Sequence, residues 1–512
     1  MARTPLANAV EEAVAKIADE QTKTTRRRFL KGAGATLVGA SLLGRLAEPG
    51  NARGAPPPGT RIAVVGAGLA GLTCAYRLQQ AGYAAQIYEA SGRIGGRCYS
   101  GTFADGQIYE HGGELIDNGH IDMKQLANEL GFTLDNLLQA ETNGTEQLGY
   151  FFGRPYTASQ MSDDLKAIWQ QLHNDVSAAS YPTLYNLSTQ RGRELDQMSI
   201  YQWIENYVPG GHNSQLGQLL DVAYNIEYGA ESKVQSSLNM LYLLGYVGPG
   251  QFRTFGKSNE KFHVHGGNDQ VPAALAGKLA SQISLNVPLT AIKLNNDGTY
   301  TLTFANGSGS FTKIADHVVL TLPFSILRGV DFSNAGFNQV KTWAINELGM
   351  GTNSKLHLQF SSRFWRNQGL TGETYSDRGY QNTWEVSRAQ PGTNGILVNY
   401  TGGTPGVNAG KGTPEQQAAT FLKQVEPVLP GATAQWNGNV FRDYWTGYQW
   451  TKGSYSYWKV GQYTRFSGAE GERSGACHFA GEHTSVDFQG YLNGAVETGE
   501  RAASDILADL KH

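Results

Sequence analysis

The sequence predicts an α/β fold of the Rossmann-like type, and three observations within one short stretch support this prediction. Residues 62–65 form an apolar, β-branched run with the length of a buried parallel strand. Gly66, Gly68 and Gly71 follow in the spacing G-x-G-x-x-G, which is typical of a tight turn into a helix. A second apolar run at 85–88 then ends at an acidic residue, as a strand–turn–helix–strand unit requires.

Each glycine of this turn has its own physical role. Gly66 permits the tight turn, Gly68 lets a pyrophosphate approach the backbone, and Gly71 lets the helix pack close to the strand. Ala70 lies in the first helical turn, whose N–H groups attract phosphate. Glu89 ends the second strand, where an acid accepts hydrogen bonds from a ribose 2′-hydroxyl and disfavours a 2′-phosphate. A bare glycine pattern can be an ordinary turn, but strand, helix and acid together predict dinucleotide binding.

The residues that follow Glu89 narrow the choice of cofactor. Arg93, Gly95, Gly96 and Arg97 complete the pattern E-A-x-x-R-x-G-G-R. This pattern resembles the signature of the amine oxidase family of flavoproteins, which includes L-amino acid oxidases and polyamine oxidases. The resemblance implies FAD, with the glycines close to the cofactor and the arginines at its diphosphate. It also implies an FAD-binding domain of the amine oxidase type with an inserted substrate domain of mixed sheet and helices.

A second match to the family lies near the C-terminus, where residues 479–503 resemble its last flavin-binding strand, loop and helix. The resemblance implies further cofactor contacts at Gly113, Glu114, Val287, Gly481, Glu482, Gly490 and Tyr491. Ser454 stands where some members carry the cysteine that links to the flavin, and serine cannot form that thioether. FAD is therefore expected to be bound non-covalently.

The composition excludes several other classes of function. The chain has 512 residues, of which 40% are hydrophobic and 17% charged, with a formal net charge of −3. This balance gives no electrostatic reason to bind nucleic acid or a membrane surface. The cysteines at 74, 98 and 477 are too widely spaced to indicate a metal cluster or a disulfide framework, and we expect no metal.

The N-terminal segment reads as a targeting sequence. Residues 25–31, TRRRFLK, match a twin-arginine export signal, and the run after them is too short and glycine-rich to span a bilayer stably. We expect a signal peptide and leader at 1–55, with the export machinery as a partner and a periplasmic or secreted location. This route carries folded, cofactor-loaded proteins, as a flavoprotein would require.

The remaining chain divides into segments of two kinds. We expect 56–120, 258–323 and 440–512 to build a discontinuous FAD-binding domain. The segments 121–257, mainly helical, and 324–439, rich in strands, are expected to build the substrate-binding domain. Assembly of the chain into a homodimer is compatible with the sequence.

The family resemblance also implies residues at the substrate. It places Lys355 near flavin N5 through a water molecule, and it makes Tyr455 and Tyr491 an aromatic pair on either side of the amine. Trp384 lies in a predicted strand that forms part of the floor of the substrate cavity.

Three carboxylates are candidates for binding a cationic substrate: Glu114, Asp117 and Asp487. Their alternative role is to solubilise loops. Leu115 stands where snake-venom-type L-amino acid oxidases carry an arginine that binds the substrate carboxylate.

The resemblance implies hydride transfer from the carbon that bears a neutral amine to FAD. Water then hydrolyses the imine to an oxo product and ammonia, and O2 reoxidises the flavin to give H2O2. We expect the substrate to be a basic L-amino acid, arginine or lysine, with a polyamine or monoamine as the alternative. A flavoprotein that is not an oxidase, such as a desaturase or isomerase, is a third class.

Overall fold

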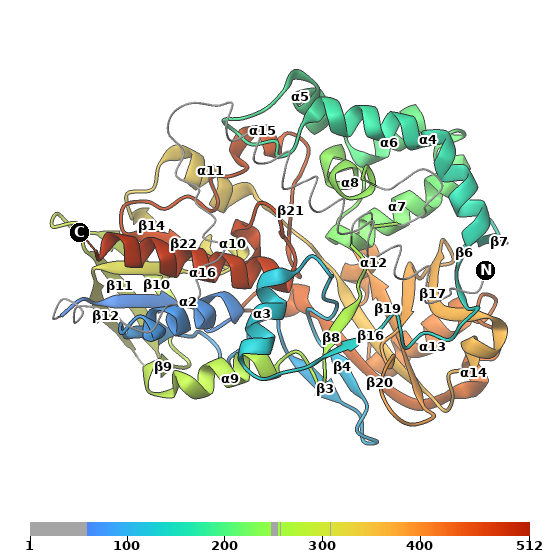
Figure 1. Ribbon diagram of the computed structural model, residues 1–512, viewed down its shortest axis with the longest axis horizontal. Helices are drawn as coiled ribbons and strands as arrows, with labels where there is room; N and C mark the ends of the chain where they lie inside the picture. The colour runs from blue at the N-terminus through green and yellow to red at the C-terminus, as the bar shows by residue number, and fades with distance from the viewer. Residues whose placement is uncertain (1–58, 247–253, 256–257, 308, 512) are drawn as a thin grey trace. The chain divides into compact units, whose positions relative to one another are not determined.

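The computed structural model describes residues 59–246, 254–255, 258–307 and 309–511, and Figure 1 shows their arrangement. Apart from residues 142–145, the described residues belong to one compact unit. The predicted signal and leader at 1–55 lie outside them. No helix in the described part of the chain is long and apolar enough to cross a membrane.

A five-stranded parallel sheet forms the first layer of the fold. In sheet order its strands are β22 (Cys477–Phe479), β13 (His317–Leu320), β1 (Ile62–Val65), β2 (Ala85–Tyr88) and β9 (Ile283–Ser284). All four residues of β1 are buried, because a central parallel strand is covered on both faces. The strands come from the three segments assigned to the FAD-binding domain, whose exact bounds stay a prediction.

Two helices pack closely against each other beside this sheet, α2 (Leu69–Gln80) and α16 (Leu492–Asp509), as Figure 1 shows. Glycines permit the close approach. A Cβ atom on Gly499 of α16 would lie 2.4 Å from the carbonyl oxygen of Ala70 in α2. A Cβ atom on Gly71 would lie 2.1 Å from the carbonyl oxygen of Gly66, so Gly71 lets α2 approach the turn after β1. α9 (Gln270–Lys278) packs against α2, and α3 (Ile121–Glu129) packs against α16.

A four-stranded sheet extends from this region. Its strands are β12 (Gly309–Ala315), β11 (Tyr300–Asn306), β10 (Leu289–Leu294) and β14 (Asp331–Asn334). The sequence predicted one strand over 284–292, and this prediction is wrong: β9 and β10 belong to different sheets. The chain turns between them because Asn286 has a φ of 62° and Pro288 has no N–H for a ladder.

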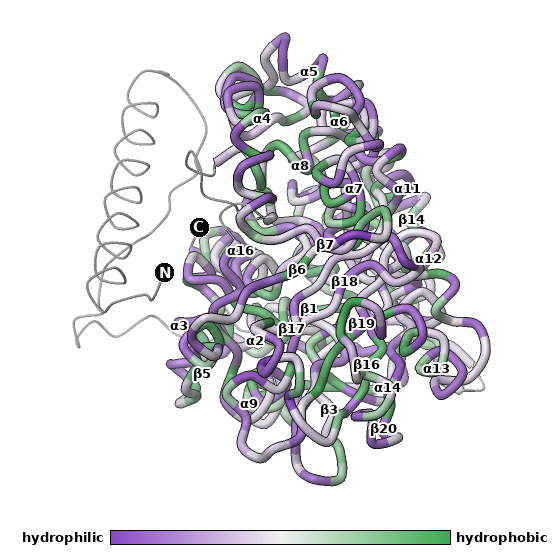
Figure 2. The backbone as a smooth tube through the Cα atoms, turned by 90° about the vertical axis from the view of Figure 1, so that its right-hand side faces the viewer, coloured by the Kyte–Doolittle hydropathy of each residue, from purple (hydrophilic) through white to green (hydrophobic). Residues whose placement is uncertain are grey.

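A seven-stranded mixed sheet forms the second large layer. Its strands are β20 (Trp436–Tyr444), β16 (Ser354–Phe360), β19 (Gly395–Thr401), β18 (Asn382–Glu385), β17 (Leu370–Ser376), β6 (Glu146–Phe151) and β7 (Arg154–Thr157). The centre of this sheet is hydrophobic, as the green tube along β19 in Figure 2 shows. The segment 121–257, predicted as mainly helical, thus supplies two strands to this sheet, β6 and β7.

Helices cover one end of the second sheet, and short elements complete the fold. The helices are α4 (Ala158–Ala179), α5 (Gln190–Asp196), α6 (Ile200–Tyr207), α7 (Gln215–Tyr228) and α8 (Ser237–Leu244). Further helices are α10 (Phe324–Leu327), α11 (Gln339–Glu347), α12 (Gly403–Asn408), α13 (Pro414–Val425), α14 (Ala432–Gln435) and α15 (Gln462–Phe466). The short strand pairs are β3 (Ser100–Thr102) with β4 (Ile108–Glu110), β5 (Leu134–Asn136) with β8 (Phe262–Val264), and β15 (Gly349–Met350) with β21 (Ser456–Tyr457).

Candidate active site

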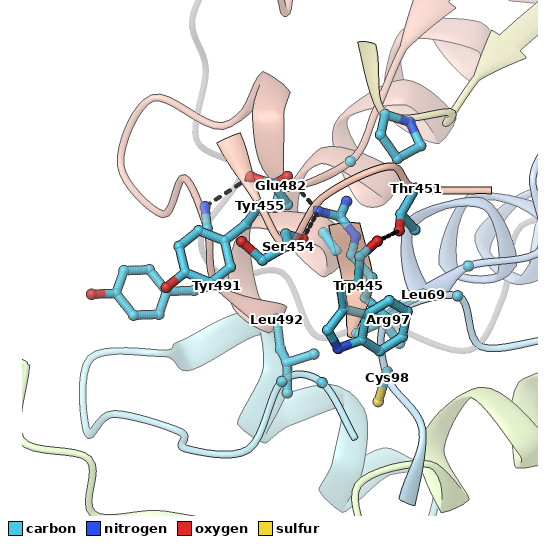
Figure 3. A pocket seen from close by; sticks show the side chains of 18 of the residues that line it. Leu69, Arg97, Cys98, Trp445, Thr451, Ser454, Tyr455, Glu482, Tyr491 and Leu492 are labelled. Carbon is cyan, nitrogen blue, oxygen red and sulfur yellow. Dashed lines mark hydrogen bonds and ion pairs between the residues drawn. The ribbon is translucent and has the colours of Figure 1, made fainter. Parts of the chain in front are cut away.

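One large cavity lies where the two sheet layers meet. Residues at the carboxyl ends of β1, β2, β13 and β22 line one part of it, including Gly66, Glu89 and Gly481. Residues of the seven-stranded sheet, such as Lys355 and Trp384, line the other part. The carboxyl edge of a parallel sheet is where such folds bind dinucleotides, and Figure 3 shows part of this cavity.

The glycine turn has the backbone geometry that its sequence predicted. Gly66 has a φ of 110°, and a Cβ atom there would lie 2.3 Å from Thr321 Oγ1. A Cβ atom on Gly68 would meet nothing within 4 Å, so the missing side chain leaves open space beside the turn. Gly68 also begins α2 without a side-chain cap, and Leu69 and Ala70 line the cavity. Uncapped N–H groups at a helix start fit a pyrophosphate.

Glu89 is fixed at the end of β2 by hydrogen bonds to its carboxylate. Its Oε2 accepts from the Ala67 amide at 2.8 Å, and its Oε1 accepts from the amide and the hydroxyl of Ser91 at 2.8 and 2.7 Å. The Val287 amide donates to the Glu89 carbonyl oxygen at 2.9 Å, and both residues line the cavity. The acid and the valine that the sequence assigned to the adenosine half therefore lie together.

The two arginines of the G-G-R motif have different positions. Arg97 lines the cavity and donates from Nη1 to Glu482 Oε1 at 2.8 Å and to the Ser454 carbonyl oxygen at 2.7 Å. Arg93 is not among the lining residues; its guanidinium lies 4.4 Å from the ring centroid of Tyr99. Its side chain stacks on this aromatic ring, and the contact of Arg93 with the cofactor stays a prediction. Gly95 and Gly96, with φ of 91° and 58°, do line the cavity.

Glu482 is a buried acid at the junction of several elements. Besides Arg97, it accepts from Ser456 Oγ at 2.7 Å and from the Gly490 amide at 3.0 Å. Burial alone would raise the pKa of Glu482, but Arg97 and these hydrogen bonds lower it overall. Figure 3 shows Arg97 directed toward this carboxylate.

A second helix begins at the cavity. α16 starts after Tyr491, which gives it no side-chain cap, and Gly490, Tyr491 and Leu492 all line the cavity. Gly113 also lines it and packs under this helix start, since a Cβ atom there would lie 2.7 Å from Leu492 Cδ2. The positive end of a second helix dipole therefore faces the cavity.

Lys355 and Glu114 form a buried ion pair at the cavity wall. The Lys355 Nζ donates to Glu114 Oε2 at 2.7 Å and to the carbonyl oxygens of Glu110 and Gly112 at 3.1 and 2.9 Å. The Trp384 indole donates to Glu114 Oε1 at 2.8 Å. Burial would raise the pKa of Glu114, but Lys355 and these hydrogen bonds lower it to about 2. Glu114 is thus ionised and already neutralised, which leaves it no charge to spare for a cationic substrate.

The predicted aromatic pair also lies at the cavity. The Tyr455 hydroxyl is 2.8 Å from that of Tyr400, and the Tyr491 hydroxyl donates to Glu227 Oε1 at 2.9 Å. Ser454 lines the same region and donates to Asn353 Oδ1 at 2.7 Å. Whether a substrate sits between the two tyrosines stays a prediction.

Two of the acids that the sequence assigned to the substrate lie outside the cavity lining. Asp117 Oδ1 accepts from the Ser258 hydroxyl and from the amides of Asn259 and Glu260, at 2.9, 3.1 and 2.7 Å, so it caps a loop. Asp487 is exposed, and its Oδ1 accepts from the Tyr181 hydroxyl at 3.0 Å. Asp117 is thus engaged by a hydroxyl and two backbone amides, and Asp487 lies at the surface, so the assignment of both to the substrate stays a prediction without support from these contacts.

Three glutamates that the sequence analysis missed do line the cavity: Glu227 at the end of α7, Glu260 before β8, and Glu373 in β17. Burial raises the pKa of Glu227 to about 7 and that of Glu260 well above its ordinary value. Burial likewise raises the pKa of Glu373, whose Oε1 accepts from the Tyr375 hydroxyl at 2.8 Å. In the sequence, Glu227 is noticeable only as a glutamate at the start of a mainly apolar stretch, 227–246, because no motif surrounds it.

These features define a class of protein: an oxidoreductase with a dinucleotide cradle that opens into an aromatic, acidic substrate chamber. The family model described as "Flavin containing amine oxidoreductase" matches residues 69–507, and the chain belongs to this family. It is an FAD-dependent oxidase of amines or amino acids. The open space at Gly68 and the two uncapped helix starts fit FAD.

Several characterised proteins are similar over most of the chain. An L-amino acid dehydrogenase of Synechocystis sp. is 25% identical and aligns over 89% of this chain and 96% of its own length. Polyamine oxidase 1 of Zea mays is 24% identical over 88% and 90%. Among solved structures, putrescine oxidase bound to putrescine has a TM-score of 0.76 at 21% identity, covering 88% of this chain and 99% of its own. Cyclohexylamine oxidase from Brevibacterium oxydans has a TM-score of 0.77 at 21% identity, covering 88% and 100%.

Proposed function

We propose that the chain oxidises an amine that carries a second positive charge at a distance from the reacting nitrogen. The observation that supports this is the imbalance of charge at the cavity. Among the described residues, its lining includes six glutamates, one arginine and one lysine, the last two being Arg97 and Lys355. These two cations neutralise Glu482 and Glu114, and Glu89 is held by backbone and serine donors.

The three remaining acids, Glu227, Glu260 and Glu373, make no ion pair with any cation in the described part of the chain. Arg388 acts on Glu260 and Glu373 through its charge, but it donates to Glu141 and to the Glu385 carbonyl oxygen. A buried carboxyl without a cation is costly, and a cationic ligand offsets that cost. A distal ammonium or guanidinium group is the complementary chemistry.

The same cavity favours a diamine or polyamine over the basic L-amino acid that the sequence suggested. An α-carboxylate needs a cation, yet Arg97 and Lys355 already face carboxylates, and Leu115 lines the wall where some relatives carry an arginine. A basic L-amino acid remains the second candidate, supported by the similarity to an L-amino acid dehydrogenase. Both candidates share the distal cation.

FAD, when bound, accepts a hydride from the carbon next to the neutral amine and passes its electrons to O2. The chain's own residues orient the substrate and exclude water from it. Tyr400, Tyr455 and Tyr491 present aromatic walls, which attract an alkylammonium chain through both packing and cation–π contact. Glu227, Glu260 and Glu373 attract the distal cation and so determine which end of a long amine lies next to them.

Pairs of substrates that differ only in the distal charge test this proposal. We expect kcat/KM to be about tenfold to hundredfold higher for putrescine than for butylamine, and for lysine than for norleucine, since a charged hydrogen bond contributes about 1.5–3 kcal/mol. Peroxide release is the readout. Equal values within each pair would refute the distal-cation proposal, and the ratio of putrescine to lysine separates the two candidates.

We also propose that FAD is held without a covalent bond, because the residue at the linking position is Ser454 and its hydroxyl already donates to Asn353. Acid precipitation should then release the whole yellow chromophore into the supernatant. Flavin that stays on the precipitated protein would contradict this.

We further propose export by the twin-arginine route, on the basis of Arg26, Arg27 and the apolar run that follows. Replacing both arginines by lysine should retain active enzyme in the cytoplasm. Unchanged activity outside the cytoplasm would argue against this signal.

A further inference from the structure

A cluster of metal-ligating side chains lies at the edge of the parallel sheet opposite the cavity. His317 begins β13, His478 lies in β22, and Asp509 is the last residue of α16. One ligand atom from each of the three lies within 4.8 Å of the others. The parallel register aligns Val319 with His478, so His317 and His478 project from the same face of the sheet. α16 brings the carboxylate to that face.

The two imidazoles are buried, and three of their four ring nitrogens are buried without a hydrogen-bond partner among the described residues. His317 is 8% exposed and His478 is 1% exposed. Nδ1 of His317 and both ring nitrogens of His478 have no partner among the described residues. Nearly all buried polar atoms in proteins are satisfied, so nitrogens of this kind indicate a missing partner.

The chemistry of the cluster suits a cation rather than an anion. A neutral imidazole offers a ring-nitrogen lone pair to a metal ion. Two imidazoles with carboxylate oxygen form a donor set that zinc and related divalent ions prefer.

A second carboxylate and a competing cation complete the surroundings. Asp505 lies one turn before Asp509 on the same helix face, and its Oδ2 is 3.9 Å from His478 Nδ1. Arg473 donates to both oxygens of Asp509, at 2.8 and 2.6 Å. The Arg473 side chain is 48% exposed and can turn into solvent, whereas the histidines are held by their strands. Binding of a metal ion would therefore break the surface ion pair between Arg473 and Asp509 and replace it by direct ligation of Asp509.

We propose that His317, His478 and Asp509 bind one divalent transition-metal ion, with Zn²⁺ as the expected ion and Asp505 as a further ligand. The ion would tie the end of α16 to two strands of the cofactor-binding sheet. It would not take part in the reaction: α16 has 18 residues, so at about 1.5 Å per residue its far end lies roughly 25 Å from the end that opens on the cavity.

Equilibrium dialysis of the FAD-loaded enzyme against buffered Zn²⁺, followed by elemental analysis, tests the site. We expect one bound equivalent, and a Tm that rises with the free Zn²⁺ concentration, since an ion that binds only the folded state stabilises it. Co²⁺ in place of Zn²⁺ should give the visible absorption bands of a low-coordinate imidazole site.

Two variants and a control make the test specific. Asp509→Asn keeps the shape of its side chain, and His478→Ala removes a buried ligand; each should weaken Zn²⁺ binding by more than about 100-fold, beyond the effect of losing an outer-shell partner. FAD content and kcat should stay unchanged in Asp509→Asn. His265→Ala, in which an exposed histidine is removed from a loop, should bind Zn²⁺ like the parent. No stoichiometric metal on the parent, or undiminished binding by Asp509→Asn and His478→Ala together, would overturn the proposal.

Discussion

Glu114 and Glu227 border the same cavity, yet they have opposite electrostatic character. Burial acts on both, but Lys355 lies 2.7 Å from Glu114 and holds its pKa at about 2, whereas Glu227 has a tyrosine hydroxyl as its partner and a pKa of about 7. The difference shows that the partner, rather than burial, decides whether a cavity acid is fixed as an ion or left able to respond.

This contrast separates the two halves of the cavity. Near the glycine motifs, each acid has a cation or backbone donors, so that region is electrostatically complete within the chain. Toward α7 and β17, the acids face one another and lack a cation among the described residues. Under the proposed function, the first half borders the cofactor and the second binds the distal cation of the substrate.

The largest effect should come from a substitution in the half of the cavity where each acid has a cation or backbone donors. Lys355→Met leaves the buried Glu114 carboxylate without its cation, which should lower the free energy of unfolding by about 3–5 kcal/mol. Urea denaturation of the FAD-loaded enzyme measures it. Lys355→Met combined with Glu114→Gln removes both charges and should recover most of the loss. If the single variant is as stable as the parent, the ion pair of Lys355 and Glu114 does not stabilise the cavity wall.

A smaller effect should come from a substitution in the other half of the cavity, whose acids lack a cation among the described residues. Glu227→Gln keeps the hydrogen bond from Tyr491 but removes the charge, and it should reduce the ratio of kcat/KM for putrescine over butylamine by about tenfold. Glu194→Gln, at an exposed position on α5, is the matched control and should leave the ratio unchanged. An unaltered ratio in Glu227→Gln would remove this residue from substrate selection.

The same ratio should depend on pH in a direction fixed by the pKa of Glu227. Below about 7 this carboxyl is protonated and neutral, and above it the group is an anion, so preference for the dication should rise as pH increases through that value. Glu114, with a pKa of about 2, stays charged throughout and contributes no change. A ratio that is flat with pH, or that falls, would assign the selectivity to a group that does not titrate there.

The finest test alters only the partner of Glu227. The Tyr491 hydroxyl stabilises the ionised carboxylate, so Tyr491→Phe should raise the pKa of Glu227 further and move the midpoint of the pH profile upward by up to about one unit. The profiles of Tyr491→Phe and the parent are compared with the same two amines. A midpoint that stays in place would show that this hydroxyl does not control the acid.

The sequence predicted the cofactor half of the cavity much better than the substrate half. Gly66 and Gly68 sit in a short motif where each glycine has a local backbone reason, so spacing locates them. Glu482 was assigned through the family resemblance of residues 479–503. Glu227 and Glu373 come from a helix and a strand that only the tertiary fold brings together. No local pattern encodes that meeting.

Two of the predicted site residues have other partners in the structure, for physical reasons. Asp117 follows the glycine motif as a substrate acid would, but three donors of residues 258–260 consume one of its oxygens. The family resemblance assigns Arg93 to the diphosphate, and its guanidinium lies 4.4 Å from the ring centroid of Tyr99. In both places a competing partner, invisible in the linear sequence, decided the position of the side chain.

The contact of α2 with α16 has a consequence for the order in which the enzyme is made. β1 and α2 come from the start of the described chain, whereas Glu482, Gly490 and the start of α16 come from its end, and all of them border one cavity. A ribosome releases the second set last. The cradle is therefore incomplete until residues 482–495 have been made, and FAD can be captured in full only after that point of synthesis.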